Sequence, residues 1–232
     1  MGLHHLTKDI QRACSQEKAK RYKLYFKDCF LDKKDRFLGV SLPDQKKIAN
    51  RHPEVDLKDV HKLLKSDIHE YRMVGGLILA NMYKEEPIDE LVEYYLENIR
   101  RFNSWDLVDM TCDRILGRYL LDKKKKRKIL HDFAKSTNLW ERRVSIMSTF
   151  QFVKARDFGD TLKIAEKLFK DKTELTQKAV GSMLREIGTR DKEVLLDFVK
   201  SNFDKIPKVT LETIVERMKP KEREKFLSEV SK

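Results

Sequence analysis

The chain has 232 residues and a net charge of +12, because 50 Lys and Arg stand against 38 Asp and Glu. Hydrophobic residues make up 40% of the chain and charged residues 38%, a composition that argues against intrinsic disorder and suffices for a folded core. Only 8 Gly and 5 Pro occur, which argues against a turn-rich β fold and favours helices. No stretch of about 18 apolar residues is present, so a membrane-spanning role is not expected.

The first residues lack the apolar segment of a signal peptide, and we expect a cytoplasmic protein with no membrane partner. Cys14, Cys29 and Cys112 are odd in number and widely spaced. We therefore expect buried free thiols rather than disulfides or a Cys-x-x-Cys site. The six His show none of the spacings of helical metal sites, and we expect neither a metal nor a cofactor.

Apolar residues recur at helical spacing along most of the chain, and no segment alternates as a strand would. Examples are residues 77–83, 91–99 and 164–169. Capping or helix-breaking residues separate such stretches near positions 41–43, 86–87, 104, 122, 137–138, 173, 188–189, 207 and 220. The pattern predicts an all-α chain of about a dozen helices, each roughly 10 to 17 residues long.

Three helical segments, 69–76, 139–146 and 175–182, share one sequence pattern. Aligned, they superimpose Val74, Val144 and Val180, and also Arg72, Arg142 and Lys178. Segment 104–109 occupies the gap midway, which gives steps of 35, 35 and 36 residues. Such a period predicts a curved α-solenoid in which each helix pair buries its apolar face against its neighbours. The helices that begin near 69, 104, 138 and 174 would be the second members of their pairs and line one surface.

Two charged residues depart from this repeat. Asp109 takes the place of the three valines, and Arg143 stands where the other copies have apolar or small residues. Trp105 precedes Asp109 by four residues, which puts the indole and the carboxylate on one helix face. One interpretation is a structural ion pair between Asp109 and Arg143, with Trp105 packed between repeats. The other is a concave cleft in which the carboxylate, the cation and the aromatic ring bind a ligand.

Positive charge concentrates around Asp109. Residues 100–156 contain 15 Lys and Arg against 6 Asp and Glu, which is +9 of the total. Such a run is compatible with a solvated helix face, but its concentration here favours a polyanion, and duplex DNA matches a curved basic surface. No zinc-finger, helix-turn-helix or RNA-binding motif indicates base-specific readout. The candidate DNA-binding residues are Arg114, Arg118, Lys123, Lys124, Lys125, Lys126, Arg142 and Lys154.

The segment Asn-Ser-Trp-Asp-Leu-Val-Asp at 103–109 resembles the AlkD-type DNA alkylation repair family, glycosylases built from HEAT-like repeats. Further similarity at residues 25–30, 37–43, 69–72, 139–143 and 177–186 extends the resemblance over nearly the whole chain. It implies a single HEAT-like repeat domain over residues 1–232. It also implies an enzyme that hydrolyses the N-glycosidic bond of cationic N3- or N7-alkylated purines in duplex DNA, leaving an abasic site without base flipping.

The resemblance also implies roles for individual residues. Asp109 would be the catalytic carboxylate, Trp105 would contact the lesion nucleotide, and Arg143 would hold the DNA backbone. Tyr25 aligns with a tyrosine of the family's lesion cleft, whereas Ser182 stands where the family has a second lesion-contacting tryptophan. We expect a monomer that is associated with the nucleoid and binds DNA containing alkylated purines.

Three functions stay open on the sequence alone. The alkylpurine glycosylase is favoured by Trp105, Asp109 and Arg143 together with the local positive charge. A protein that binds DNA or branched DNA without cutting it is the alternative suggested by Ser182. A protein-interaction scaffold is the third, since helical repeats commonly serve that purpose.

Overall fold

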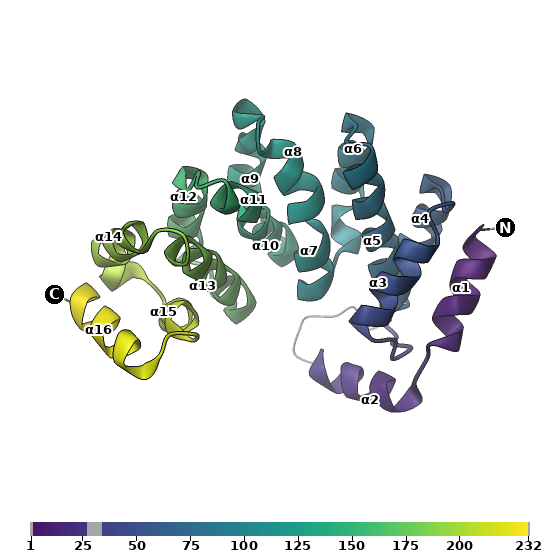
Figure 1. The fold of residues 1–232 in the computed structure, drawn as a ribbon, viewed down its shortest axis with the longest axis horizontal. Helices are drawn as coiled ribbons and strands as arrows, with labels where there is room; N and C mark the ends of the chain where they lie inside the picture. The colour runs from purple at the N-terminus through teal and green to yellow at the C-terminus, as the bar shows by residue number, and fades with distance from the viewer. Residues whose placement is uncertain (1, 27–33, 232) are drawn as a thin grey trace. The chain divides into compact units, whose positions relative to one another are not determined.

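The computed structural model describes residues 2–26 and 34–231, and these form helices joined by short connections (Figure 1). Within the described residues there is no β-strand, and the single bridge joins Arg36 to Ile68. The chain divides into two compact units, Met1–Ile115 (unit 1) and Leu116–Lys232 (unit 2). The predicted all-α, helical-repeat fold is therefore confirmed, while one domain over residues 1–232 stays a prediction.

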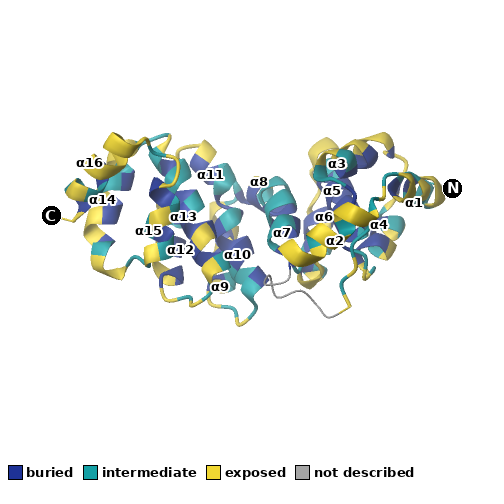
Figure 2. Cartoon of the chain, turned by 90° about the horizontal axis from the view of Figure 1, so that it is seen from below, coloured by how far each residue is buried: buried dark blue, intermediate teal, exposed yellow. Residues whose placement is uncertain are grey.

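Unit 1 is built around one long helix. Its helices are α1 (Gly2–Arg12), α2 (Gln16–Tyr25), α3 (Leu42–Arg51), α4 (Leu57–Leu64), α5 (His69–Glu85), α6 (Asp89–Glu97) and α7 (Trp105–Thr111). Helix α5 packs against α3, α4, α6 and α7, and most of its side chains are buried (Figure 2). A Cβ at Gly75 would lie 3.0 Å from Leu63, and one at Gly76 would lie 2.8 Å from Phe102. The glycine pair thus lets neighbouring segments approach α5 closely on two sides.

Unit 2 repeats this arrangement around α13. Its helices are α8 (Arg118–Leu120), α9 (Lys128–Phe133), α10 (Leu139–Met147), α11 (Phe150–Lys154), α12 (Gly159–Leu168), α13 (Glu174–Gly188), α14 (Lys192–Asn202), α15 (Lys208–Val215) and α16 (Pro220–Val230). Helix α13 contacts α10, α11, α12, α14 and α15. A Cβ at Gly181 would lie 2.6 Å from Thr213 and 2.7 Å from the Thr210 carbonyl oxygen, so this glycine lets α15 pack tightly on α13.

The same hydrogen-bonded turn precedes three of the repeat helices. In each turn, the side chain of the first residue accepts a hydrogen bond from the backbone N–H two residues later. The backbone carbonyl of the same first residue accepts a hydrogen bond from the side chain six residues later. The accepting and donating residues are Ser66 and Arg72, Ser136 and Arg142, and Asp171 and Gln177. The turn satisfies polar groups at a helix start, where backbone groups lack intrahelical partners.

This turn corrects the alignment of the last copy by one residue. Gln177 is buried and takes the place of Arg72 and Arg142, whereas Lys178 is exposed and pairs with Glu174. The alignment of Lys178 was wrong because it matched charge, while the turn requires a buried side-chain donor. The corrected period is 35 residues throughout, and Asp109 still aligns with Val74 and Val144.

Helix lengths are less regular than predicted. Helices α7, α8, α9 and α11 have 7, 3, 6 and 5 residues. The first three are short because a π-helical turn at 113–117 and a 3-10 turn at 124–127 interrupt the α-helical pattern. The predicted starts near 69, 104, 138 and 174 are confirmed. Cys112 is buried as predicted, but Cys14 is exposed because it lies in the turn between α1 and α2. Cys29 lies outside the described residues.

The basic run at 123–128 contains one structural arginine. The side chain of Arg127 is only 3% exposed, and it donates hydrogen bonds to Asp157 and Asp160, both at 2.9 Å. It also donates to the carbonyl oxygens of Leu120 and Leu121. Its neighbours at 124–126 are exposed. Arg127 therefore ties the run to the start of α12, whereas the lysines are displayed to solvent.

We predict that Arg127→Met lowers the free energy of unfolding by about 3 kcal/mol, because two partly buried carboxylates and two carbonyls lose their donor. The control Lys125→Met, in the same run, should change it by less than about 0.5 kcal/mol. Urea denaturation of both variants checks this. Equal stability of the two variants would contradict the structural role of Arg127.

Candidate functional site

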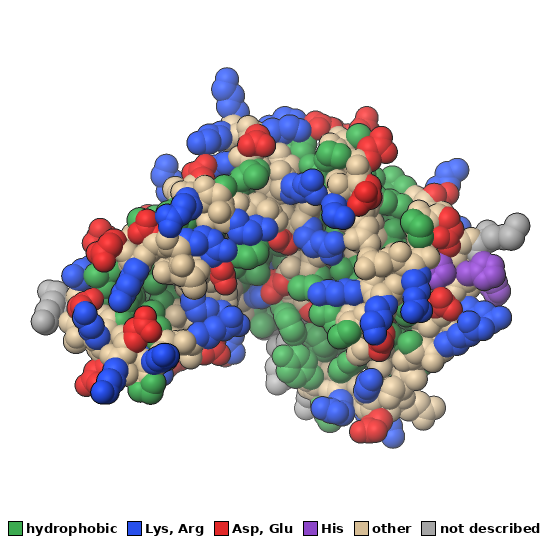
Figure 3. Space-filling model, in the orientation of Figure 1, with side chains coloured by type: hydrophobic (Ala, Val, Ile, Leu, Met, Phe, Trp, Pro, Cys, Tyr) green, Lys and Arg blue, Asp and Glu red, His purple; other side chains and the backbone are tan. Residues whose placement is uncertain are grey.

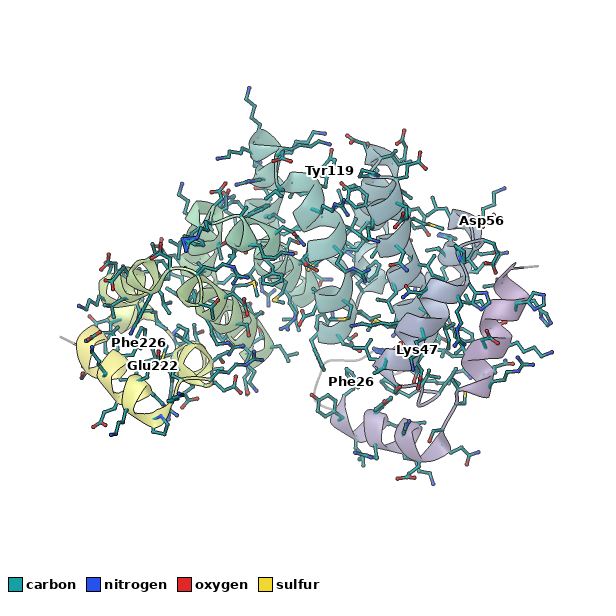
Figure 4. The ribbon with its side chains drawn as sticks, viewed as in Figure 1. Phe26, Lys47, Asp56, Tyr119, Glu222 and Phe226 are labelled. Carbon is teal, nitrogen blue, oxygen red and sulfur yellow. The ribbon has the colours of Figure 1, made fainter. Side chains whose placement is uncertain are left out.

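An aromatic cavity in unit 1 brings two of the predicted site residues together. Its volume is about 700 Å³, and side chains of α2, α5 and α7 contribute to its walls. The Trp105 ring lies edge-on to Tyr25, with centroids 6.1 Å apart, and is stacked on Phe26 at 5.7 Å. Phe26 directly follows α2 (Figure 4), and hydrophobic side chains gather there on the surface (Figure 3). The cavity can therefore receive a flat or apolar group beside the Trp105 indole.

The first turn of α7 is fixed by the carboxylate of Asp106, whose side chain is 15% exposed. Asp106 Oδ1 accepts hydrogen bonds from Ser104 Oγ (2.6 Å) and from the Leu107 backbone N–H (2.9 Å), and Oδ2 lies 2.8 Å from His69 Nε2. Burial opposes ionisation of Asp106, but the hydrogen bonds from His69, Ser104 and Leu107 outweigh it and hold the pKa below its ordinary value. An ionised Asp106 thus joins the start of α7 to the start of α5.

A second carboxylate, that of the fully buried Glu70, also lines the cavity. Glu70 is fully buried, and it accepts hydrogen bonds from the backbone N–H groups of Leu38 (2.9 Å), Gly39 (2.7 Å) and Val40 (3.3 Å). Gly39 has φ of 79°, a left-handed conformation that favours glycine. The Leu38 carbonyl in turn accepts a hydrogen bond from the N–H of Ser15, the N-cap of α2. Glu70 therefore links α5, through segment 38–40, to α2.

Asp109 is half-buried one turn after Trp105 on α7. Val74 and Val144, at the equivalent repeat positions, are fully buried, and so is the neighbouring Val108. Asp109 therefore replaces a core residue without being sealed into the core, as a carboxylate that meets a ligand requires. Among the described residues, those from α7 that line the aromatic cavity are Trp105, Asp106 and Met110, so Asp109 lies next to this cavity rather than in its wall.

Arg143, Arg142 and Ser182 are predicted site residues of unit 2. Arg143 is only 6% exposed and donates a hydrogen bond to the Leu175 carbonyl oxygen at 2.6 Å. Arg142 pairs with Asp171 at 2.6 Å in addition to its bonds in the repeat turn. Ser182 is half-buried on α13. Each arginine thus has a structural contact within unit 2, and pairing of Arg143 with Asp109 stays a prediction.

The predicted basic residues divide by exposure. Lys124, Lys125, Lys126, Arg118 and Lys154 are exposed. Lys123 and Lys126 lie over the ring of Tyr119, at 3.8 and 5.0 Å from its centroid, and Tyr119 is marked in Figure 4. Such an aromatic platform orients two ammonium groups at the surface of unit 2.

In unit 1, Arg114 is half-buried and donates a hydrogen bond to Asn81 at 2.9 Å. Its side chain is therefore held against α5, unlike the exposed lysines of unit 2. A role for Arg114 in DNA binding stays a prediction.

Four further residues of this site were not predicted from the sequence: His69, Glu70, Asp106 and Phe26. The signal that would have found His69 and Glu70 is polarity at a helix start, because both precede the apolar stretch 73–80 of the same helix. Among residues 2–26 and 34–231, no helix is long and apolar enough to cross a membrane. The same part of the chain contains no group of three or more His, Cys, Asp and Glu that could hold a metal ion.

We predict that Glu70→Ala destabilises unit 1 by about 2 to 4 kcal/mol, because three backbone N–H groups lose their acceptor. Glu70→Gln keeps one acceptor oxygen and should be affected less. Thermal denaturation together with limited proteolysis near residues 38–40 measures both effects. Equal melting temperatures for Glu70→Ala and the unmodified protein would contradict the anchoring role.

The sequence matches a family described as DNA alkylation repair enzyme over residues 6–218. No curated protein matches. The fold is similar to that of a predicted DNA alkylation repair enzyme from Enterococcus faecalis, with a TM-score of 0.70 and 15% identity over 89% of this chain and 97% of that one. It is also similar to AlkD2 from Streptococcus mutans, with a TM-score of 0.53 and 17% identity over 92% and 98% of the two chains. Because the family match spans most of its length, the chain belongs to the family of DNA alkylation repair enzymes.

Proposed function

We propose that the chain is a DNA glycosylase that releases cationic N3- and N7-alkylated purines from duplex DNA without flipping the base. The observation that carries the proposal is the position of Asp109, half-buried one turn after Trp105 where the repeat otherwise buries a valine. Family membership supports a role in the repair of alkylated DNA. The proposed reaction uses no metal and no cofactor.

The chemistry required of Asp109 is limited because the substrate is already activated. An N3- or N7-alkylated purine carries a positive charge and leaves as a neutral base with the electron pair of the C1′–N bond. The sugar then develops oxocarbenium character, which an ionised carboxylate stabilises. Water adds to C1′ and loses a proton, giving the abasic site. Asp109 would stabilise the cationic sugar and orient this water.

Trp105 would contribute through the electron-rich face of its indole. A cationic nucleobase or sugar beside an indole is attracted by the ring quadrupole, more than a neutral base is. Tyr25, which is 67% exposed and edge-on to Trp105, extends the same aromatic surface. The pair of Trp105 and Tyr25 would favour a charged lesion. Tyr25 would also compensate in part for the family tryptophan in whose place Ser182 stands.

Affinity for DNA would come mainly from the exposed cations of unit 2. The exposed Lys124, Lys125, Lys126, Arg118 and Lys154, with the half-buried Lys123, present ammonium and guanidinium groups that suit phosphate oxygens. Arg143 would hold the DNA backbone near the lesion. Arg142 and Arg114, which we also keep as candidate DNA contacts, would have to share their structural bonds with a phosphate. The protein would act as a monomer associated with the nucleoid.

We predict that Asp109→Asn lowers the rate of base release at least 100-fold, because loss of one preformed charge at a developing cation costs about 10² to 10³ in rate. Affinity for the same duplex should change less than twofold. Release of N3-methyladenine and N7-methylguanine from methylated duplex under single-turnover conditions measures the rate, and fluorescence anisotropy measures the affinity.

A wild-type rate in Asp109→Asn would contradict the role of this carboxylate. Absence of release from wild-type protein that still binds the duplex would instead favour the alternative, a non-catalytic protein that binds DNA or branched DNA. In that case Ser182→Trp tests whether the missing tryptophan is the cause. Base release by this variant would identify the missing ring as the reason for the inactivity.

We predict that the double variant Lys124→Ala, Lys125→Ala weakens DNA binding about tenfold at 150 mM salt and lowers the slope of log K against log salt by roughly 1 to 2, because two phosphate contacts are lost. The matched control Lys219→Ala, Lys221→Ala removes the same charge from exposed positions at the start of α16. Equal effects of the two double variants would contradict a specific contact by lysines 124 and 125.

A further inference from the structure

Trp105 begins a short helix, so its orientation needs support from outside that helix. Helix α7 has 7 residues, and Trp105 is its first. First turns fray because their N–H groups have no intrahelical acceptor. Asp109 lies one turn further along the same helix, so whatever fixes the start of α7 also fixes this carboxylate.

His69 meets the start of α7 through its ring nitrogen. Its side chain is 4% exposed, and Nε2 lies 2.8 Å from Asp106 Oδ2. Asp106 in turn caps the helix start through Ser104 Oγ and the Leu107 N–H. Among the described residues, His69 Nδ1 has no hydrogen-bond partner. Nε2 is therefore the ring nitrogen through which His69 donates to the carboxylate.

A second link from His69 to Trp105 is indirect and runs through the ring of Phe26. Its imidazole lies 5.1 Å from the ring centroid of Phe26 and 4.9 Å from that of Phe37. Phe26 is stacked on Trp105 with an interplanar angle of 16°. The imidazole therefore supports the back of the aromatic stack that ends in the indole, while its Nε2 holds the backbone from which the indole projects.

We propose that His69 is the positioning residue of the site: through Asp106 and through Phe26 it fixes the orientation of Trp105 and, along α7, of Asp109. Its effect on catalysis rests on the proposed function, whereas its effect on Trp105 does not. His69 also lines the aromatic cavity, and the role proposed for it is to position Trp105 and Asp109 rather than to react.

Two substitutions separate the two contacts. His69→Phe keeps an aromatic ring against Phe26 and Phe37 but removes the donor to Asp106. His69→Gln keeps an N–H donor at the position of Nε2 and removes the ring. The control is His61→Phe, because His61 is a half-buried histidine of α4 whose Nδ1 lies 3.0 Å from Tyr94 Oη, outside this cluster.

The indole itself is the reporter. The chain has 2 Trp, so a Trp140→Phe background leaves Trp105 as the only tryptophan. We expect His69→Phe to raise acrylamide quenching of Trp105 fluorescence about twofold and to slow single-turnover base release at least about tenfold, with DNA affinity within twofold, since small misplacement of reacting groups is costly. His69→Gln, which loses the ring contact but keeps the donor, should change both readouts less than His69→Phe does, and His61→Phe should change neither.

Unchanged quenching in both His69 variants would overturn the proposal. If wild-type protein releases no base, the proposed function fails while the quenching measurement still decides the role of His69. If His69→Phe does not fold, Asp106→Asn replaces it, because this change removes the ionised partner of Nε2 and keeps the size of the side chain. It must then raise Trp105 quenching, and an unaltered value would equally overturn the proposal.

Discussion

The start of α5 is where unit 1 is held together, because three polar side chains are buried there and each must find a partner. His69 meets Asp106 at the start of α7, Glu70 accepts three backbone N–H groups from segment 38–40, and Arg72 pairs with Asp35. An unpaired polar group in such a place costs more free energy than a paired one returns. Satisfying these three residues therefore fixes the segments that form the aromatic cavity.

The fold and the site differed in how far the sequence could predict them. Helical periodicity and the scarcity of Gly and Pro were enough to predict an all-α repeat fold. Burial of one helix face requires apolar residues at regular helical spacing, and this pattern is visible in the sequence itself. Lys178 was aligned with Arg72 because both are positively charged, whereas the repeat turn requires a buried hydrogen-bond donor, which is Gln177. Asp109 was found because it departs from the repeat, and Trp105 because it precedes Asp109 by one helical turn. His69 and Phe26 were missed because their roles depend on contacts between segments distant in the sequence.

The basic side chains of unit 2 serve different purposes according to whether they are buried or exposed. In one basic run, Arg127 is bound to two carboxylates while the lysines at 124–126 are exposed. The same residue types thus serve the stability of unit 2 and the proposed contact with phosphates. Arg142 and Arg143 likewise bond within unit 2, so positive charge alone does not identify a DNA contact.

The central claim is that the chain breaks N-glycosidic bonds of alkylated purines in DNA. The most direct measurement is to incubate the purified protein with methylated duplex DNA and quantify both the released bases and the abasic sites left in the strand. We expect release of N3-methyladenine and N7-methylguanine, with one new abasic site for each base released. Tight binding of that duplex with neither product formed would contradict it.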